Sequence, residues 1–464
     1  MSERMKNLRK RAESCAERIR TQKSVHVVSH IDADGLTSAG IICTALKRAG
    51  IEYSTRFVKQ LDEKALDKLA NENHNLVIFT DLGSGMCEPL KTRGIRAVVS
   101  DHHRPQGELE FPDLHLNPHL FGANGAYELS GSGTTYLLAS ALGKNQDLAD
   151  LAIVGAVGDM QHLKMGQLTG INREILKEGA REGVLSYRKD LTLFGKQTRP
   201  IFKLLQYSSD PYLPGLTGDE DACIEFLQER GLRFSQEERW RRWIELNPSE
   251  KQKLVSGLIQ YCLSLGLSTY KIERLVGEVY ELLKEREGTE MRDASEFSTL
   301  LNATARYDHA EIGLAVCMGN REEAYEAARK LLAEHRQNLV NGLIYVKEKG
   351  VIELENLQYF DAGSEIKETI VGIIAGMSST IVPNRNLPII AFANSEEGIK
   401  VSARATQDLI RKGINLSEAM EKVSTEVGGA GGGHDIAAGA TIPKGNQEEF
   451  IQKLDLFIGK QLKK

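Results

Sequence analysis

Disulfide frameworks, membrane spans and excess basic charge are all missing from this sequence. Its six cysteines are spread singly with no CxxC pair, so we expect reduced thiols and neither a disulfide framework nor a cysteine zinc site. No apolar run approaches the length that crosses a bilayer, and residues 1–23 lack the apolar core of a secretory signal. The net charge of −5 argues against a surface coated in basic charge but leaves room for a local nucleic-acid groove. We therefore expect a cytoplasmic protein without a membrane partner.

The pattern of apolar runs predicts an α/β fold. With 464 residues, 41% of them hydrophobic and 27% charged, the chain fits a folded protein of two or three domains. Between residues 24 and 190, runs that are apolar on consecutive positions alternate with helical segments, as in a parallel sheet covered on both faces. We expect a parallel-sheet first domain and a smaller α/β second domain, with a helical insertion and a long connecting helix.

Changes in this pattern set the predicted boundaries. The insertion is expected to hold helices over Asp219–Arg230, Gln236–Leu246 and Ser249–Leu263. The second domain is expected to hold strands over Leu343–Val346, Leu357–Asp361, Pro388–Asn394, Ile399–Arg404 and Ala438–Ile442. The predicted segments are 1–204 for the first part of a catalytic domain, 205–295 for a helical insertion that could dock a partner, 296–320 for the return to the catalytic domain, 321–341 for the connecting helix and 342–464 for a substrate-binding domain.

Four apolar runs in the first third of the chain end in acid or histidine. They are Val25–Ser29 before His30, Asp32 and Asp34; Leu76–Thr80 before Asp81; Ala97–Ser100 before Asp101, His102 and His103; and Ala152–Gly158 before Asp159. We interpret all four as strands, whose carboxyl ends meet at one edge of a parallel sheet. Carboxylates and imidazoles gathered there could bind a pair of divalent cations for phosphoryl transfer. Asp81 is the best candidate to bridge the two ions.

A structural explanation of the same residues has to be weighed. A single Asp after a strand is usually a helix cap or a turn residue, and Asp101 in particular could serve to orient a neighbouring histidine. A lone histidine such as His26, His74 or His115 is more often packed or exposed than bound to a metal. Four ligand-bearing ends in one array are hard to obtain as independent caps, so the metal hypothesis is favoured.

The last third of the chain carries groups suited to binding phosphate. Arg404 can hold a phosphate through two donors. The glycines of Gly428–Gly433 let backbone N–H groups approach a phosphate closely, and His434 adds a donor. A flexible linker is the alternative, but a helix precedes this run and a strand follows it. Arg239–Trp243 looks like a nucleic-acid patch, although tryptophans at this spacing favour packing in a core or on a partner.

These motifs resemble, in order and spacing, the four motifs of the DHH phosphoesterase superfamily. They are His30–Gly35, Thr80–Asp81, Asp101–His103 and Gly155–Asp159, and Ser130–Gly133 resembles the superfamily's phosphate-proximal loop, which implies substrate contacts from Ser130, Gly131 and Ser132. The resemblance implies two divalent ions, Mn²⁺ first and Mg²⁺ second. It assigns His30, Asp32 and Asp81 to one ion, and Asp34, Asp81, His102 and Asp159 to the other. His103 would lie at the scissile phosphate, in a catalytic set with Asp81 and the supporting Asp101.

The second half extends the resemblance over essentially the whole chain. Ile399–Arg404 and Gly431–Gly439 look like the DHHA1 substrate domain, which implies substrate contacts from Ser402, Arg404, Gly432, Gly433 and His434. Phe297–Arg306 resembles the segment before that domain in RecJ-type exonucleases, which adds Arg306, although Ala305 replaces a family glycine. The chain as a whole is similar to the archaeal RecJ-like, GINS-associated nucleases. Unlike bacterial RecJ, it shows no evident OB-fold segment.

The resemblance implies a metal-dependent exonuclease that hydrolyses phosphodiester bonds at the end of single-stranded DNA. It favours the 5′-to-3′ direction, with RNA as a further substrate, a link to replication or repair, and the GINS complex or replicative helicase as partner. Two alternatives stay open. One is an oligoribonuclease or cyclic-dinucleotide phosphodiesterase; the other is a non-catalytic scaffold of the replicative helicase, against which the filled metal-ligand positions speak.

Overall fold

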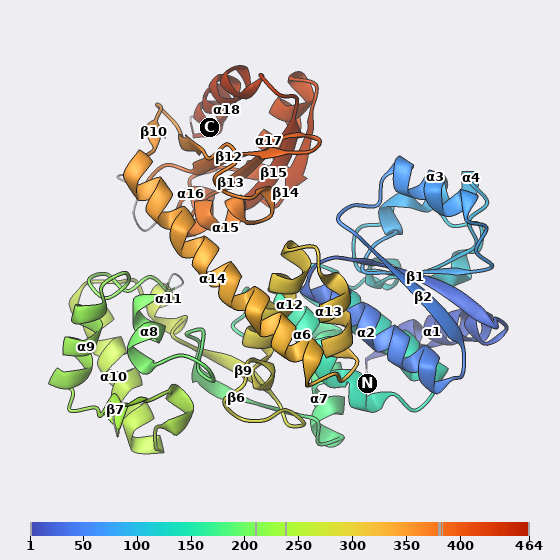
Figure 1. The fold of residues 1–464 in the computed structure, drawn as a ribbon, viewed down its shortest axis with the longest axis horizontal. Helices are drawn as coiled ribbons and strands as arrows, with labels where there is room; N and C mark the ends of the chain where they lie inside the picture. The colour runs from blue at the N-terminus through green and yellow to red at the C-terminus, as the bar shows by residue number, and fades with distance from the viewer. Residues whose placement is uncertain (1, 209–210, 237–238, 379–381, 383, 463–464) are drawn as a thin grey trace. The chain divides into compact units, whose positions relative to one another are not determined.

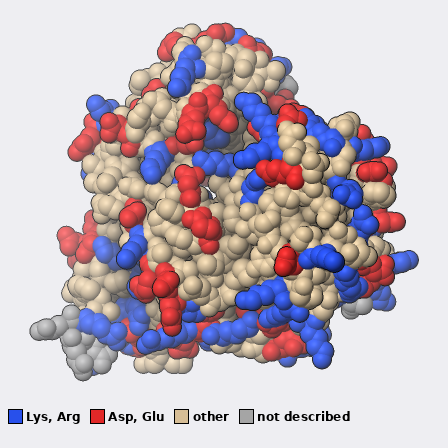
Figure 2. All heavy atoms as spheres, turned by 45° about the vertical axis from the view of Figure 1, so that its right-hand side comes forward, with Lys and Arg blue, Asp and Glu red and all other residues tan. Residues whose placement is uncertain are grey.

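The α/β prediction is confirmed, and the chain divides into two compact units, Met1–Leu332 and Ala333–Lys464. The computed structural model describes residues 2–208, 211–236, 239–378, 382 and 384–462. Among these residues, every helix is too short or too polar to cross a membrane. On the face drawn in Figure 2, basic and acidic side chains are intermixed, as expected from 59 Lys and Arg against 64 Asp and Glu.

The N-terminal part of the first unit is built on a five-stranded parallel sheet, two of whose strands are labelled in Figure 1. Its strand order is β2 (Glu52–Val58), β1 (Ser24–His30), β3 (Val77–Thr80), β4 (Ala97–Ser100) and β5 (His115–Leu116). One face packs against α1 (Glu3–Arg20), α2 (Ala33–Arg48), α5 (Gly131–Leu142) and α6 (Ala149–Gly158). The other face packs against α3 (Glu63–Asn71) and α4 (Cys87–Thr92). Successive strand residues enter opposite cores, which explains why the strands are apolar on consecutive positions.

Residues 191–275 of the first unit surround a core of their own. Leu191, Phe202, Phe226 and Leu254 are among the residues buried there. The elements of the first unit that follow α6 are α7 (Gly170–Arg181), β6 (Leu185–Leu191), α8 (Ile201–Gln206), α9 (Glu220–Glu229), β7 (Ser235–Gln236), β8 (Arg239–Trp240), α10 (Pro248–Ser264), α11 (Thr269–Glu273), β9 (Val276–Leu282), α12 (Ala294–Arg306) and α13 (Ala310–Cys317). Of these, α7, α12 and α13 pack into the core of the sheet. Strands β6 and β9 pair antiparallel over their whole length. The long helix α14 (Glu323–Lys349) spans the boundary between the units.

The second unit is built on a six-stranded, mostly antiparallel sheet. Its order is β10 (Ile352–Glu353), β11 (Gln358–Asp361), β12 (Ile389–Ser395), β13 (Gly398–Arg404), β15 (Ala437–Ile442) and β14 (Ala430–Gly433). The helices are α15 (Glu368–Ser378), α16 (Gln407–Arg411), α17 (Leu416–Glu426) and α18 (Gln447–Leu462). One face of the sheet packs on α17 and α18, and the other packs on α15. The segment boundaries inferred from the sequence stay predictions.

One of the four expected strands before a metal ligand is wrong, because Ala152–Gly158 is part of α6. A short run that is apolar on every position fits a buried strand and a fully buried helix equally well. Close packing against α2 and α5 favours the helix over a strand for this run. A methyl group at Gly155 would overlap Ser132 Oγ, Asp34 Oδ1 and Thr37 Oγ1, and such an approach is available to a helix with small residues on its contact face.

Two other segment predictions are also wrong. The expected helix over Gln236–Leu246 consists, where described, of β7, β8 and the 3-10 turn Trp243–Glu245. Trp243 is buried as expected, whereas Trp240 is 44% exposed. The expected strand Leu343–Val346 is the last third of α14. Leu339, Leu343 and Val346 pack together in one core, at the spacing of one helix face.

Replacement of Gly155 tests the helix packing. We expect Gly155→Ala to lower the free energy of unfolding by about 1–3 kcal/mol, because an added methyl group has no space between α2 and α5. Urea denaturation followed by circular dichroism measures the change. The control is Gly85→Ala, where the methyl group meets nothing within 4 Å, and it should change stability by less than about 0.5 kcal/mol. Equal effects of the two substitutions would contradict this packing.

Candidate metal centre

The first two ligand-type side chains lie where β1 passes into α2. His30 is the last residue of β1, and Asp32 is the N-cap of α2, with its Oδ1 accepting a hydrogen bond from Gly35 N at 2.9 Å. Helix α2 starts at Ala33, and Asp34 lies in its first turn. The amide of Ala33 donates to Asn302 Oδ1 at 2.9 Å, which ties the start of α2 to α12.

Asp34 is held by the N-terminus of another helix. Its Oδ2 accepts from Gly131 N at 2.7 Å and its Oδ1 accepts from Ser132 N at 2.9 Å. The carboxylate is 2% exposed, and free amides at a helix start stabilise such a buried negative charge. Ser130 caps the same helix through its Oγ, which accepts from Gly133 N at 3.0 Å. Residues 130–132 therefore hold the Asp34 side chain in place. Their direct contact with substrate stays a prediction.

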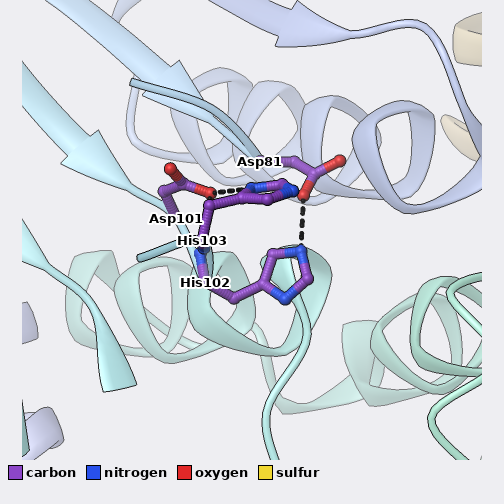
Figure 3. A group of neighbouring side chains, drawn as sticks. All are labelled: Asp81, Asp101, His102 and His103. Carbon is purple, nitrogen blue, oxygen red and sulfur yellow. Dashed lines mark hydrogen bonds and ion pairs between the residues drawn. The ribbon is translucent and has the colours of Figure 1, made fainter. Parts of the chain in front are cut away.

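Asp81 occupies the centre of the group. It follows β3 with a φ of 59°, a left-handed conformation that a non-glycine residue keeps only when its surroundings enforce it. Its Oδ1 lies 3.2 Å from His102 Nε2 (Figure 3). Its Oδ2 lies 3.6 Å from His30 Nδ1. The 2% exposed carboxylate is thus placed between two imidazoles from different strands.

His102 is oriented by a backbone carbonyl. Its Nδ1 lies 2.7 Å from Gly125 O; since a carbonyl only accepts, Nδ1 carries the hydrogen. The other nitrogen, Nε2, is then the one directed toward the carboxylates, 3.2 Å from Asp81 and 3.8 Å from Asp34. Asp159, the C-cap of α6, comes within 3.8 Å of the same ring. A carbonyl behind a ligand histidine is a common way to fix the ring in metal sites.

Asp101 supports its neighbours. The side chain is fully buried, and its Oδ1 accepts from His102 N at 2.7 Å and from His103 N at 3.2 Å. The same oxygen lies 2.7 Å from His103 Nδ1 (Figure 3). The other oxygen, Oδ2, accepts from Ser84 N at 2.9 Å. His103 is the exposed member, with 58% of its side chain accessible. This geometry favours orientation of His103 by Asp101, as the sequence indicated.

Among the sets of side chains whose ligand atoms lie within 4.8 Å of one another, two hold the ligands of this centre: His30, Asp32 and Asp81, and Asp34, His102 and Asp159. These are the six residues that the sequence nominated as ligands, and the structure brings them together. Nδ1 of His30 and Oδ1 of Asp81 are buried and face other ligand-type groups, Asp32 Oδ2 at 3.0 Å and His102 Nε2 at 3.2 Å. Carboxylate oxygens and imidazole nitrogens that converge in this way are the donors that divalent cations such as Mn²⁺ accept, so the donor set fits divalent cations. The assignment of each ligand to an ion stays a prediction.

Burial and mutual repulsion shift the protonation of this group. Burial and the charge of Asp81 raise the pKa of Asp34 to about 8, and burial raises the pKa of Asp159 to about 6. Burial opposes charge on His102, but hydrogen bonding to Asp81 and the carboxylates around it raise its pKa well above the usual value. Without cations, the centre therefore retains protons near neutral pH.

Gln161 links the two sides of the centre, and sequence reasoning missed it. The side chain is 2% exposed. Its Nε2 donates to Asp159 Oδ2 at 2.8 Å and to Gly125 O at 2.7 Å, and its Oε1 accepts from Asn172 Nδ2 at 2.6 Å. One amide thus holds a carboxylate and the carbonyl that orients His102. No sequence motif identifies such a residue. Its role becomes visible only in the structure, where the side chain is buried.

Other histidines of the first unit are not in this centre. His115 is buried, with its Nε2 2.8 Å from Ser84 Oγ. His26 and His74 stack at 4.1 Å, and His74 lies beside a Glu72 that is already bonded to Arg56. Ligand atoms of His26, Glu72 and His74 also lie within 4.8 Å of one another, so the expectation that these three histidines bind no metal stays a prediction.

The remaining predicted substrate residues fall in two places. Arg306 ends α12 in the first unit, where burial lowers its pKa and the carboxylate of Asp32 opposes this effect.

The other predicted substrate residues lie in the second unit. Ser402 and Arg404 lie on β13; Gly432 and Gly433 lie on β14, and His434 follows directly. Strand β15 separates the two strands. A Cβ on Gly372 of α15 would come 2.6 Å from Arg404 Nη2 and 3.0 Å from Ser402 Oγ, so this glycine makes room for both side chains.

Sequence profiles of three domain families match the chain. The DHH family N-terminal domain matches residues 24–156, the DHH-CID domain 193–276 and the DHHA1 domain 355–460. "Uncharacterized protein MJ0831" of Methanocaldococcus jannaschii is 33% identical over the full length of both chains. The chain belongs to the DHH/DHHA1 family. This confirms the family resemblance.

More distant relatives have the RecJ name and fold. "Single-stranded-DNA-specific exonuclease RecJ" of Escherichia coli is 23% identical over 93% of this chain and 66% of that protein. RecJ of Thermus thermophilus, solved with Mn²⁺, has a TM-score of 0.60 at 18% identity, covering 98% of this chain and 55% of that one. CDC45 of Entamoeba histolytica has a TM-score of 0.66 at 12% identity, covering 98% and 99%. The structural likenesses show a shared RecJ-like fold, and the chain spans about half to two thirds of these two RecJ chains.

The raised carboxyl pKa values predict how stability depends on pH. A group whose pKa is higher in the folded state stabilises the fold below its unfolded value and loses that effect as pH rises through the folded value. For Asp159 and Asp34 the loss runs from about pH 4 to their folded pKa values of about 6 and about 8. We expect the Tm of the EDTA-treated protein to fall over this range. Since Mn²⁺ displaces the same protons, the Mn²⁺-induced rise in Tm should grow with pH. A rise in Tm that is independent of pH would contradict the pKa shifts.

Substitution of Gln161 tests the link across the centre. We expect Gln161→Ala to weaken Mn²⁺ binding about 10- to 100-fold, as loss of a residue behind the ligands commonly does. Titration calorimetry with Mn²⁺ measures this effect. The matched control is Gln197→Ala, which removes another buried glutamine whose Oε1 accepts from Gly288 N at 2.9 Å, outside the centre. Equal Mn²⁺ affinity in the two variants would show that Gln161 does not order the ligands.

Proposed function

We propose that this chain is a metal-dependent exonuclease that hydrolyses phosphodiester bonds at the end of single-stranded DNA. The observation that carries the proposal is the convergence of His30, Asp32, Asp34, Asp81, His102 and Asp159 on one centre. The RecJ relatives, named as single-stranded-DNA-specific exonucleases, support this substrate class. We further propose the 5′-to-3′ direction, RNA as an additional substrate, and Mn²⁺ ahead of Mg²⁺.

The side chains of the centre have distinct tasks in this proposal. Two divalent cations, when bound, would activate water and neutralise phosphate charge. The two groups of three ligands would hold them, with Asp81 shared. His103 is fixed through Nδ1 by Asp101, which directs its Nε2 away from the carboxylate, where it can hydrogen-bond a phosphate oxygen. Arg306, Ser402, Arg404, Gly432, Gly433 and His434 would bind the strand.

A non-catalytic role is the second candidate. The CDC45 chain has a higher TM-score than the Thermus RecJ chain, 0.66 against 0.60, so the fold alone does not separate a scaffold from an enzyme. The donor set favours the enzyme. A scaffold has no need for carboxylates whose pKa values are raised by burial and by repulsion, since uncompensated buried charge destabilises a fold.

We also propose that residues 205–295 dock the GINS complex and thereby link the protein to replication or repair. This segment packs largely around its own core, which suits a module added to the sheet domain. Its surface displays Leu263, Leu265 and Trp240, exposed by 59%, 47% and 44%. Exposed apolar side chains of this size are typical of protein contacts when they gather in a patch.

Removal of Asp81 tests the catalytic proposal. We expect Asp81→Ala to reduce Mn²⁺-dependent hydrolysis of 5′-labelled single-stranded DNA by at least about 10³-fold, because a shared ligand is lost. The control is Asp221→Ala on the exposed side of α9, which should keep full activity. Full activity in Asp81→Ala would reject the shared-ligand assignment.

A panel of long DNA, long RNA, dinucleotides and cyclic dinucleotides defines the substrate. We expect the long single strands to be cleaved from the 5′ end. Cleavage of dinucleotides alone would reject the exonuclease proposal in favour of a small-substrate phosphodiesterase. Absence of cleavage throughout, with GINS binding intact, would favour the scaffold.

Docking of GINS is tested on the surface of the insertion. We expect Leu263→Asp to weaken capture of purified GINS about tenfold or more, since a charge replaces an exposed apolar contact. Leu456→Asp on α18 is the matched control, because Leu456 is 64% exposed in the second unit. Unchanged capture by Leu263→Asp would argue that this part of the insertion is not the contact.

A further inference from the structure

A large cavity lies in the first unit beside the metal centre but outside its ligand set. Its volume is about 570 Å³, within the range of ligand-binding clefts. The walls come from the loop after α6, from β6 and β9, from α11 and from the segment that starts α12. Val157 lines the cavity, and Asp159 of the centre is only two residues further along. The same turn of chain therefore borders both sites.

The walls carry an excess of positive charge. Lys164, Lys189, Lys196 and Arg274 line the cavity together with Glu273, Glu278 and Asp293. Two of the carboxylates already have basic partners: Asp293 lies 3.3 Å from Lys196 Nζ, and Glu278 accepts from Arg173. Four basic side chains thus face three carboxylates on these walls. A wall with more basic than acidic side chains favours an anion, and lysine and arginine contact phosphates in grooves that bind nucleic-acid strands.

The rim of the cavity is apolar and open to solvent. Met165, Leu163, Tyr270 and Val276 line the cavity and are exposed by 63%, 45%, 44% and 36%. Large apolar side chains gathered at one opening indicate a binding surface. Flat apolar and aromatic groups beside cations suit a ligand with an apolar face and a negative charge, and an unpaired nucleotide has both.

The cavity also contains an unsatisfied polar atom. His162 lines it with its ring edge-on to Tyr280 at 6.3 Å between centroids. Its Nδ1 is buried and has no hydrogen-bond partner among the residues that the structure describes. Such an atom is costly to leave unpaired, and a base edge or sugar hydroxyl could satisfy it.

We infer that this cavity binds unpaired nucleotides of the strand whose end is hydrolysed at the metal centre. The inference deepens the proposed function and rests on it for the identity of the strand. It adds a strand-binding site within the first unit, separate from the substrate residues on β13 and β14. Phosphates would contact Lys189 and Arg274, and bases would pack on Tyr270 and Met165.

Binding without hydrolysis tests the site directly. The affinity of the full-length protein in EDTA is measured by fluorescence anisotropy for labelled oligo-dT of about 12 nucleotides and for the dinucleotide. We expect Lys189→Ala and Arg274→Ala each to raise the Kd for the long oligonucleotide about fivefold or more, equivalent to about 1 kcal/mol. The slope of affinity against salt should also decrease. Binding of the dinucleotide, which is too short to occupy both sites, should not change.

Matched variants separate this site from general effects. Lys64→Ala on α3, an exposed lysine far from the cavity lining, should leave both affinities unchanged. Tyr270→Ala should lower the affinity for the long oligonucleotide without changing how steeply that affinity depends on salt, because it removes stacking and not charge. Wild-type affinity of Lys189→Ala and Arg274→Ala for the long strand would overturn the inference. An equal loss of affinity for the long strand and for the dinucleotide would also overturn the inference, since that result would place Lys189 and Arg274 at the strand end.

The same measurements distinguish a failure of this inference from a failure of the proposed function. Because EDTA-treated protein is used, the anisotropy result does not depend on hydrolysis. If the protein hydrolyses no substrate but binds the long strand through Lys189 and Arg274, the cavity stands and the catalytic proposal fails. If it hydrolyses long strands and the variants cleave them with unchanged KM, the catalytic proposal stands and the cavity is rejected.

Discussion

Repulsion among buried carboxylates is the constraint on which the first unit depends. Asp34 and Asp81 are each 2% exposed, and Asp159 approaches the same imidazole, His102. Each carboxylate has its own compensation: the amides at the start of α5 for Asp34, two imidazoles for Asp81 and the Gln161 amide for Asp159. The helices that start or end here are therefore fixed by the charges they face. Divalent cations would complete the compensation.

Close helix packing follows from the same constraint. The amides of α5 reach Asp34 on α2 only because α5 and α6 lie very close to α2. Gly155 permits this approach, since a methyl group there would overlap Ser132 and Asp34. The small residues of α6 are therefore part of the centre, although none of them bears a functional group. Asp159 reaches the centre because the helix ends at this point.

Site residues that lie close together in the sequence, or directly after a strand, could be predicted. Residues that support the site from distant parts of the chain could not. His30, Asp32 and Asp34 lie within one turn, and Asp81 and His102 follow real strands, so a pattern of apolar runs revealed them. Asp159 was nominated for a wrong reason, because its run is a helix. Gln161, Asn172 and Asn302 were missed, since a buried amide that bonds across elements has no local signature. Nothing in the sequence indicated that the amides of Gly131 and Ser132 bind Asp34, and contact of the loop 130–132 with substrate stays a prediction.

The sequence by itself determined the α/β class, the family and the set of six ligand-type residues, because strand periodicity and motif spacing are local properties. Tertiary structure decided which groups face which. It made α6 a helix, placed Asp81 between two histidines and oriented His102 through a carbonyl 23 residues away in the chain. It also enclosed a cavity with a basic wall and an apolar rim from segments between Val157 and Ser295. Hydrogen bonds, charge compensation and cavities depend on distances in space, which the order of residues along the chain does not specify.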